Sequence, residues 1–519
     1  MKKRTVERKN DIGNGIKTAV WAAIAILIQV IWLYHFVFKL GEKYPWISTV
    51  TGIFALILVL SIYGQHATAS VRMPWIMLIM AFPFFGVFLY LMLGLNSGTR
   101  KMRERYEKID KELLPLLGRG DAEMAALEEF DLGIANECKY IREYAKYPVY
   151  QNTDVTFYAD SEKGLDAQLE ELQKAQKFIF MEYHAIEDSI AFQRIYTILK
   201  EKAKAGVEVR VFYDYVGSMG FIGNKFVAKL EADGIHCRVF NPVMPLINLF
   251  LNNRDHRKIT VIDGKVGFTG GYNLADEYFH ITEPYGHWLD TGIRITGEAV
   301  KSLTITFLEN WNAIRKDDKD DKNYIQYLPE CTYRAQEQGF IQPYADSPMD
   351  QEQVGENVYM NVLRNARKYA YFITPYLIIT EEMNSAFALA AKSGVDVRII
   401  TPGIPDKKLI YKVTRSYYAG LVRNGVRIYE YSPGFCHAKQ CVSDDKVATC
   451  GTINLDFRSL YHHFENGAIF SNYQAVLDMK SQFDTLFPQC REVTEEYRYG
   501  RSKVLRLSQL ILRLVAPLL

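Results

Sequence analysis

An internal duplication constrains the fold of this chain more than any other feature of its sequence. Residues 205–211 resemble residues 393–399, and both segments read Gly-Val, an acid, Val and Arg. Further along, residues 256–263 resemble residues 437–444 at an offset of 437 − 256 = 181 positions, and both have the pattern His-x-Lys-x4-Asp. Matches that recur in the same order are the signature of a repeated folding unit. We therefore expect two copies of one unit in the carboxyl-terminal part of the chain.

Each copy continues past this motif in the same way. A glycine-containing turn leads to Asn273 in the first copy and to Asn454 in the second. Each copy then reaches an acid before a segment that contains glycine. The acids are Asp290, 290 − 256 = 34 residues after its histidine, and Glu465, 465 − 437 = 28 residues after its histidine. The duplicated pattern therefore comprises a histidine, a lysine, an asparagine and an acid in each copy.

Strand and helix patterns alternate through this part of the chain. Runs that read as strands lie at 177–183, 207–214, 239–240 and 258–263. The amphipathic segment 190–205 between two of them reads as a helix. This order predicts an α/β fold with two tandem repeats, residues 148–330 and 331–500, packed as a pseudo-twofold pair. The 519 residues, 49% of them hydrophobic, are enough for such a core.

The first hundred residues contain three apolar stretches, at 18–38, 47–63 and 75–95. A helix of about 20 apolar residues crosses a bilayer, so residues 1–99 are expected to be a transmembrane region. A signal peptide is the alternative for the first stretch, but its apolar core is too long. Basic clusters flank both ends of the region and leave its orientation open. Seven cysteines without paired spacing favour a reducing compartment, so we expect the repeats to be cytoplasmic.

Two more segments lie outside the repeats. Residues 100–147 are charged and helical in pattern and are expected to link the membrane region to the repeats. In the tail, residues 501–519, Val504, Leu507 and Leu514 fall at helical spacing among basic residues. This pattern predicts an amphipathic helix in a membrane interface. A terminal helix packed on the second repeat is the alternative for the tail.

The two His-x-Lys pairs indicate the chemistry. Alternate residues of a strand point to one face, so each histidine shares a site with its lysine. An ammonium beside an imidazole suits an anion and disfavours a divalent ion, and we predict neither a metal nor another cofactor. One imidazole can attack phosphorus while the other protonates the departing alkoxide. Lysines and asparagine amides can hold the non-bridging oxygens, so two copies facing each other fit a phosphodiester.

The predicted site residues have three roles. The catalytic motif residues are His256, Lys258, Asp263, His437, Lys439 and Asp444, the substrate-binding residues are Asn273 and Asn454, and the histidine-orienting residues are Asp290 and Glu465. Among them, Asp263 and Asp444 stand at strand ends, where an acid more readily braces a turn or a lysine than touches substrate. Outside the motif, we expect a structural role for His184, His236, His280, His287, His462 and His463.

With these residues the chain resembles the phospholipase D superfamily, whose signature is His-x-Lys-x4-Asp followed by a Gly-containing Asn motif, twice per active site. The likeness covers the chain from about residue 148 onward. Within that superfamily, residues 254–258, 288–291, 374–376 and 454–459 are similar to bacterial cardiolipin synthases, as is the amino-terminal hairpin.

The resemblance implies transfer of the phosphatidyl group of one phosphatidylglycerol to a second one, with release of glycerol. It assigns the nucleophile to His256 and the general acid and base to His437. Leu289, Ile379, Thr380 and His463 depart from residues that are common in the family. These departures affect the headgroup contacts more than the phosphoryl chemistry.

The partners that follow are phosphatidylglycerol and the cell membrane, in which the chain would be a multi-pass protein, and the oligomeric state stays open. A phospholipase D or a phosphatidylserine synthase-like transferase, which uses another acceptor at the same site, is the alternative function. Nucleic acid is not an expected partner. The chain has 62 basic and 60 acidic residues, and a net charge of +2 creates no general field toward phosphate backbones.

Overall fold

The computed structural model describes residues 44–65, 69–91, 100–223, 225–242, 253–314, 321–350, 352–499 and 512–513. The expected membrane segment 18–38 and most of the tail, residues 501–519, lie outside the described residues. The two described tail residues, Leu512 and Arg513, lie against the second repeat, where Arg513 stacks over Tyr417 at 4.4 Å.

The first repeat is built on a seven-stranded sheet. Its strands, in spatial order, are β1 (Thr153–Tyr158), β9 (Gly292–Gly297), β7 (Val266–Gly270), β6 (Lys258–Ile262), β2 (Phe178–Tyr183), β3 (Glu208–Asp214) and β4 (His236–Phe240). Strands β2, β3 and β4 are parallel, and the remaining neighbours are antiparallel. Its helices are α8 (Ser161–Lys174), α9 (Ile190–Lys204), α10 (Tyr215–Ser218), α11 (Phe226–Ala232) and α12 (Val300–Ala313), with short turns η5 (Asp276–Phe279) and η6 (Tyr324–Tyr327). The strands and the helix predicted for this repeat are confirmed to within a few residues.

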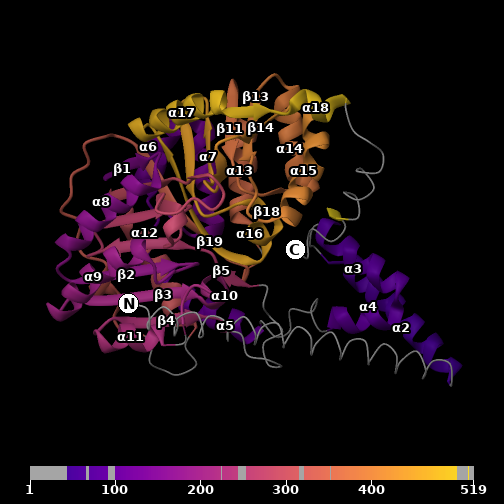
Figure 1. Cartoon of the computed structure of the whole chain (residues 1–519), viewed down its shortest axis with the longest axis horizontal. Helices are drawn as coiled ribbons and strands as arrows, with labels where there is room; N and C mark the ends of the chain where they lie inside the picture. The colour runs from indigo at the N-terminus through magenta and orange to yellow at the C-terminus, as the bar shows by residue number, and fades with distance from the viewer. Residues whose placement is uncertain are drawn as a thin grey trace.

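The second repeat has a sheet with the same order of equivalent strands. It runs β10 (Phe340–Asp346), β19 (His463–Ser471), β17 (Val447–Gly451), β16 (Gln440–Ser443), β11 (Tyr369–Ile373), β13 (Asp396–Pro402), β14 (Arg427–Tyr431) and β20 (Cys490–Glu492). Its helices are α13 (Val354–Asn365), α14 (Glu381–Lys392), α15 (Lys408–Arg423), α16 (Phe457–Tyr461), α17 (Gln474–Leu486), η7 (Phe487–Gln489) and α18 (Thr494–Tyr499). A small pair, β12 (Leu377–Ile378) with β18 (Leu455–Asp456), lies beside this sheet. The α/β fold with two tandem repeats is therefore confirmed (Figure 1).

The two repeats exchange short strands. Strand β5 (Arg254–Asp255) of the first repeat pairs in parallel with β19 of the second. Strand β15 (Gly434–Cys436) of the second repeat pairs in parallel with β8 (His287–Leu289) of the first. A continuous apolar core also runs across both repeats, and in it Phe307 of the buried helix α12 stacks on Phe180 at 4.6 Å. The repeats are thus joined by backbone hydrogen bonds as well as by apolar packing.

The segment expected to link membrane and repeats is helical, and it also packs into this core. It contains α5 (Arg100–Leu113), η3 (Leu114–Leu117), α6 (Asp121–Phe130), α7 (Leu132–Tyr140) and η4 (Ile141–Ala145). The buried Tyr106 of α5 donates a hydrogen bond to Asn310 Oδ1 of the first repeat at 2.7 Å and stacks on Phe464 of the second at 4.9 Å. Residues 100–147 therefore contact both repeats.

Among the described residues, three apolar helices precede this segment and lie to one side of the repeats (Figure 1). They are α2 (Pro45–Tyr63), α3 (Ala69–Ala81) and α4 (Pro83–Leu89), and Ala55, Ile62, Ile79 and Val87 form a small cluster between them. The expected segment 47–63 falls within α2, and the expected segment 75–95 is interrupted between α3 and α4, where Pro83 begins a new helix. Across the residues that the structure describes, the helices do not reach the combined length and apolarity of a membrane span.

The aspartate of each His-x-Lys-x4-Asp motif begins a hairpin turn, at the opposite end of its strand from the histidine. Asp263 and Gly264 connect β6 to β7 with φ of 53° and 66°, and Asp444 and Asp445 connect β16 to β17 with φ of 56° and 58°. Aspartate tolerates this left-handed region better than most residues with a side chain. These angles suit the tight turn of a twisted hairpin.

The carboxylates of these two aspartates brace the neighbouring strand. That of Asp263 accepts hydrogen bonds of 2.7–2.9 Å from the backbone N–H groups of residues 176, 177 and 178 at the start of β2. That of Asp444 accepts equivalent bonds of 2.6–2.9 Å from residues 367, 368 and 369 at the start of β11. The sequence places Asp263 and Asp444 in the catalytic motif but favours a bracing role for them. Their hydrogen bonds to backbone N–H groups agree with the bracing role.

We predict that Asp263→Ala destabilises the protein without a specific effect on the active site. The substitution removes the acceptor of three backbone N–H groups and leaves alanine at positive φ, which together cost about 2–4 kcal/mol. Thermal unfolding in detergent measures the change. Asp263→Asn keeps an acceptor and tolerates the turn, so it should recover much of the loss, and the exposed Asp166→Ala should have little effect. An Asp263→Ala protein with unchanged stability and no activity would contradict this role.

Candidate active site

The strand exchange brings the two motif histidines to the junction of the repeats. His256 follows β5 directly, and its backbone N–H donates to the carbonyl of Phe464 in the second repeat at 2.8 Å. His437 follows β15 directly, and its N–H donates to the carbonyl of Leu289 in the first repeat at 2.7 Å. Each histidine thus stands just before its sheet strand, rather than within it as the sequence suggested. Its backbone is held by the opposite repeat.

The two predicted orienting acids reach the histidines, and they do so across the repeats. His256 Nδ1 lies 2.9 Å from Glu465 Oε2, and His437 Nδ1 lies 2.7 Å from Asp290 Oδ2. A carboxylate only accepts, so the proton of neutral His256 lies on Nδ1 and the lone pair of its Nε2 is left for chemistry. His437 Nδ1 also lies 2.7 Å from Lys439 Nζ. Each histidine is therefore oriented by the acid of the other copy.

The glycine-containing turns make room for these acids. A Cβ atom on Gly271 would lie 2.1 Å from Asp290 Oδ1, so a larger residue cannot stand there without moving the carboxylate. The second copy has Thr452 at the equivalent position, and its hydroxyl donates a hydrogen bond to Glu465 Oε2. In the first copy, the glycine leaves space for the Asp290 carboxylate. In the second copy, the threonine hydroxyl binds the Glu465 carboxylate.

The two motif lysines are buried, each beside the histidine of its own motif. Lys258 Nζ donates to the carbonyl of His256 at 2.6 Å, and Lys439 Nζ donates to the carbonyl of His437. Burial and then the charge of Lys439 lower the pKa of Lys258 to about 7. Burial lowers the pKa of Lys439 to about 8, against the opposing effect of Asp290 and Glu465. Burial and mutual repulsion destabilise the charged forms of the two lysines. An anion that binds between them would stabilise these charged forms.

The histidines themselves are neutral in the free site. Burial first, and then Lys258, lower the pKa of His256 well below its ordinary value. Burial and then Lys439 lower the pKa of His437 to about 3, although Asp290 opposes the shift. A neutral imidazole with its Nδ1 proton on a carboxylate has a nucleophilic Nε2. Binding of a negative phosphodiester would favour protonation of the second imidazole, as general acid catalysis requires.

The two predicted substrate-binding asparagines are both buried at this site, with different partners. Asn273 Oδ1 accepts from the backbone N–H of Ala185 at 3.1 Å, and its amide donates to the Tyr278 hydroxyl at 2.8 Å. Asn454 Oδ1 has no hydrogen-bond partner among the described residues. The second asparagine is therefore freer to contact a substrate than the first.

Two histidines that the sequence placed outside the site lie next to His256. The ring of His184 is 4.9 Å from that of His256, and its Nδ1 donates to the carbonyl of Asp255 at 2.6 Å. The ring of His463 is 5.4 Å from that of His256, and its Nδ1 lies 3.5 Å from Glu465 Oε1. The signal for His463 was its position two residues before the orienting acid.

His437 has an aromatic environment instead. The rings of Tyr278, Trp288 and Phe435 lie 5.2, 5.6 and 5.9 Å from its imidazole. The two halves of the site thus share their reactive groups and differ in the side chains that surround them.

Three side chains of the site could reach one metal ion. The donor atoms of His256, His463 and Glu465 lie within 4.8 Å of one another. Lys258 lies beside this group, and an ammonium opposes a divalent cation. The expected absence of a metal stays a prediction, and the chemistry of the two imidazoles needs none.

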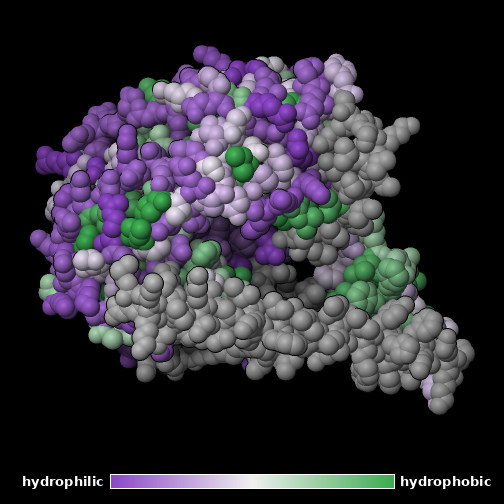
Figure 2. Space-filling view, viewed as in Figure 1, coloured by the Kyte–Doolittle hydropathy of each residue, from purple (hydrophilic) through white to green (hydrophobic). Residues whose placement is uncertain are grey.

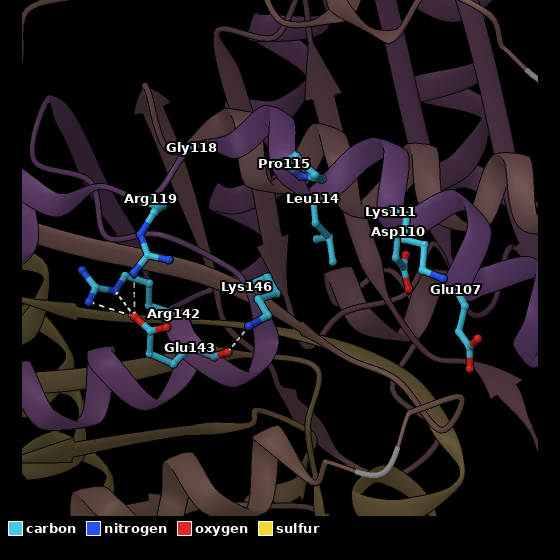
Figure 3. Close-up of a pocket in the computed structure, with 10 residues that line it drawn as sticks. All are labelled: Glu107, Asp110, Lys111, Leu114, Pro115, Gly118, Arg119, Arg142, Glu143 and Lys146. Atoms are coloured by element: carbon cyan, nitrogen blue, oxygen red, sulfur yellow. Dashed lines mark hydrogen bonds and ion pairs between the residues drawn. The ribbon is translucent and has the colours of Figure 1, made fainter.

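A separate groove of about 490 Å³ lies on the helical segment before the repeats (Figure 3). The charged residues that line it are Glu107, Asp110, Lys111, Arg119, Arg142, Glu143 and Lys146. Its cations are largely paired, since Arg119 and Arg142 both bind Glu143 and Lys146 donates to the Glu143 carbonyl. The groove contains no residue of the duplicated motif.

Comparison with protein families gives two matches. The family described as cardiolipin synthase, phospholipase D-like domain, matches residues 169–307 and 359–487, one range within each repeat. The family described as phospholipase D-nuclease N-terminal matches residues 53–94, which include most of α2 and the helices that follow it.

Individual relatives agree with the family match. A protein of Streptococcus mutans without a described function is 39% identical, over 88% of this chain and 98% of its own length. A cardiolipin synthase of a Geobacillus species is 33% identical, over 86% of this chain and 88% of its own length. Among solved structures, phosphatidylserine synthase of Haemophilus influenzae has a TM-score of 0.56 at 14% identity, over 73% of this chain and 99% of its own. That last likeness shows the fold alone.

We predict that Asp290→Asn and Glu465→Gln each lower the turnover of phosphodiester transfer. An amide can turn its NH2 group toward Nδ1 and so favour the wrong imidazole tautomer. The expected loss in kcat is roughly 10²–10⁴-fold, with a smaller change in KM. Steady-state kinetics on a soluble short-chain substrate measures both constants.

The control for these variants is Glu492→Gln, because Glu492 lies on the edge strand β20 of the second sheet and pairs there with Arg427 of β14. It should leave kcat near the wild-type value. Wild-type turnover in both Asp290→Asn and Glu465→Gln would contradict the orienting role.

Proposed function

The chain belongs to the cardiolipin synthase family of phospholipase D-like proteins, and we propose on this premise that it transfers a phosphatidyl group between two phosphatidylglycerol molecules. The products are cardiolipin and glycerol. The observation that carries the proposal is the pair of His-Lys sets at one junction, each imidazole held by the acid of the other repeat. Such a site exchanges one phosphodiester for another without an energy source.

We propose that the first half of the reaction forms a phosphohistidine. Nε2 of one imidazole bonds to phosphorus, and the bond from phosphorus to the glycerol oxygen breaks. The other imidazole, protonated, gives its proton to the departing oxygen. The family resemblance gives the first role to His256 and the second to His437. The buried Lys258 and Lys439 stabilise the charge on the non-bridging oxygens.

The second half reverses these steps with another alcohol. A hydroxyl of the second phosphatidylglycerol gives its proton to the acid-base histidine and attacks phosphorus. The bond between phosphorus and the nucleophilic imidazole then breaks, and both histidines return to their starting state. The acceptor determines the product, because water in the same place would give phosphatidic acid instead of cardiolipin.

We further propose that residues 1–99 hold the enzyme in the cell membrane. Six apolar side chains of α2 are 45–63% exposed, namely Val50, Ile53, Phe54, Leu56, Ile57 and Leu60. Apolar surface also gathers over these helices in Figure 2, whereas much of the visible surface of the repeats is hydrophilic. A contiguous exposed apolar surface favours contact with lipid over contact with water. A membrane-held enzyme would meet its lipid substrates in their own layer, with the repeats on the cytoplasmic side.

We predict that His256→Ala and His437→Ala each abolish product formation from labelled phosphatidylglycerol in detergent. Each removes one of the two groups that must act together, while wild-type enzyme yields cardiolipin. EDTA should not reduce activity, because no step uses a metal. His236→Ala, an exposed histidine on β4 away from the junction, is the control and should be active. Strict dependence on an added divalent ion, or phosphatidic acid as the sole product, would overturn the mechanism or the acceptor respectively.

We predict that deleting residues 1–99 moves the protein from the membrane fraction to the soluble fraction. The full chain should stay with membranes after alkaline carbonate washing, because its apolar segments hold it there. Immunoblotting of the washed fractions measures the distribution. A full chain that washes off would show that these residues only touch the surface.

A further inference from the structure

Two equivalent loops lie beside the active site, one in each repeat. Strands β3 and β13 have the same place in the two sheets, and a loop follows each of them. Through β2, the carboxyl end of β3 lies close to the level of Lys258. Through β11, the carboxyl end of β13 lies close to the level of Gln440, the residue after Lys439. Both loops therefore leave their sheets at the edge where the motif histidines stand.

Hydrogen bonds connect both loops to the exchanged strands that lead into the histidines. Asp214, at the end of β3, accepts a bond of 2.8 Å from Nε of Arg254 in β5. Helix α10 then continues from Asp214 to the first loop, residues 219–223. In the second repeat, the backbone N–H of Ile404 donates to the carbonyl of Gly434 in β15 at 3.2 Å. We call residues 219–223 and 403–409 the rim loops, the second of which includes the first turn of α15.

Each rim loop exposes apolar side chains. Phe221 is 37% exposed in the first, and Ile404 and Leu409 are 41% and 49% exposed in the second. Single apolar residues are common on protein surfaces. These residues, however, lie at the same edge of both repeats, beside a site whose proposed substrate is a lipid. An apolar side chain at this edge gains free energy when it enters the acyl boundary of a bilayer.

The charges of the rim loops select the kind of membrane. Lys407 and Lys408 are exposed in the second loop, and Lys225 is exposed just beyond the first. The acid of the second loop, Asp406, accepts a hydrogen bond of 2.6 Å from the half-buried Tyr376, so its carboxylate is held against the protein. Lysines near a membrane surface are attracted to anionic headgroups. The rim loops therefore combine apolar side chains with cations that suit anionic phospholipid.

We propose that the rim loops dock on an anionic phospholipid bilayer, with Phe221, Ile404 and Leu409 in the acyl boundary and the lysines among the headgroups. The proposal rests on the proposed function, because it gives the site access to a lipid substrate. It also goes beyond anchoring by residues 1–99, which holds the protein on the membrane without orienting the site. Docking on both sides of the junction places the two histidines over the headgroup layer, where the phosphodiesters lie.

Tryptophan fluorescence tests the contact directly. The full chain is reconstituted in vesicles of phosphatidylglycerol and phosphatidylcholine, with or without bromine on the acyl chains, since bromine quenches nearby indoles. Phe221→Trp and Ile404→Trp should each add emission that bromine quenches, measured as the difference from the wild-type protein. Leu389→Trp should add emission that bromine does not quench. Leu389 is 66% exposed near the end of α14, which leads to the opposite edge of the second sheet.

Activity on two forms of the substrate tests the consequence of docking. Phe221→Ser combined with Ile404→Ser should lower cardiolipin formation in the vesicles about tenfold, because the rim loses its apolar contacts. The same variant should retain nearly wild-type activity on short-chain phosphatidylglycerol dispersed in detergent, where docking is not needed. The matched control is Leu389→Ser combined with Lys392→Gln, two exposed residues of α14, and it should resemble the wild type on both substrates.

The role of the charges is tested by Lys407→Gln combined with Lys408→Gln. This variant should lower activity in the vesicles several-fold at low salt and leave activity in detergent unchanged. Because salt screens exposed charges, the difference from the wild type should shrink as the salt concentration rises. A loss that does not depend on salt would overturn the electrostatic part of the proposal.

The outcomes separate this inference from the function on which it rests. Phe221→Trp and Ile404→Trp proteins that are quenched no more than Leu389→Trp would overturn the docking. Equal losses of Phe221→Ser with Ile404→Ser on both substrates, with a lower melting temperature, would show that these side chains only support the fold and would also overturn it. A wild-type enzyme that forms no product from either substrate would remove the proposed function, whereas the quenching would still decide whether the rim loops contact lipid.

Discussion

The structure depends on the exchange of two short strands between the repeats. Each exchanged strand leads into a histidine, and each receiving strand contains or precedes the acid that binds its Nδ1. Neither repeat alone can assemble a histidine with its carboxylate. An isolated repeat would hold an imidazole without a fixed tautomer and an acid without a partner. Correct packing of the two repeats is therefore the condition for chemistry as well as for stability.

The junction tolerates many buried charges because rigid backbone and opposite charges surround them. Arg257, between the motif histidine and lysine, is fully buried and lies 2.8 Å from Glu309 Oε2 of helix α12. Its guanidinium also donates to the carbonyl of Glu465 at 3.2 Å, so it fixes the backbone of the acid that orients His256. Such a cation costs free energy to bury, and the Glu309 carboxylate and the two accepting carbonyls offset part of that cost. The result is a site whose groups need little rearrangement when the substrate arrives.

The duplication made much of this predictable from the sequence. Offsets between the copies located the histidines, lysines and acids, and residue patterns placed the four strands and the one helix that were predicted in the first repeat to within a few residues. The crosswise pairing was not predictable, because sequence spacing reports which acid follows which histidine and not which acid faces it. That choice depends on β5 and β15, strands of two and three residues that are too short for a periodic pattern. The packing of residues 100–147 into the core was hidden for a similar reason, since their charged surface masks a buried face that includes Tyr106, Ile109 and Leu113.

The least predictable feature is the difference between the half-sites. A search for duplicated residues finds what the copies share and passes over His463, whose equivalent is Trp288. Yet the two histidines have different tasks, since one attacks phosphorus and the other protonates the departing alcohol. Two half-sites with identical surroundings would not distinguish the side of the nucleophile from the side of the leaving group. The shared residues supply the phosphoryl chemistry, which is the same in both half-reactions. The positions where the copies differ, such as Trp288 and His463, are then the ones available to distinguish the two sides of the phosphodiester.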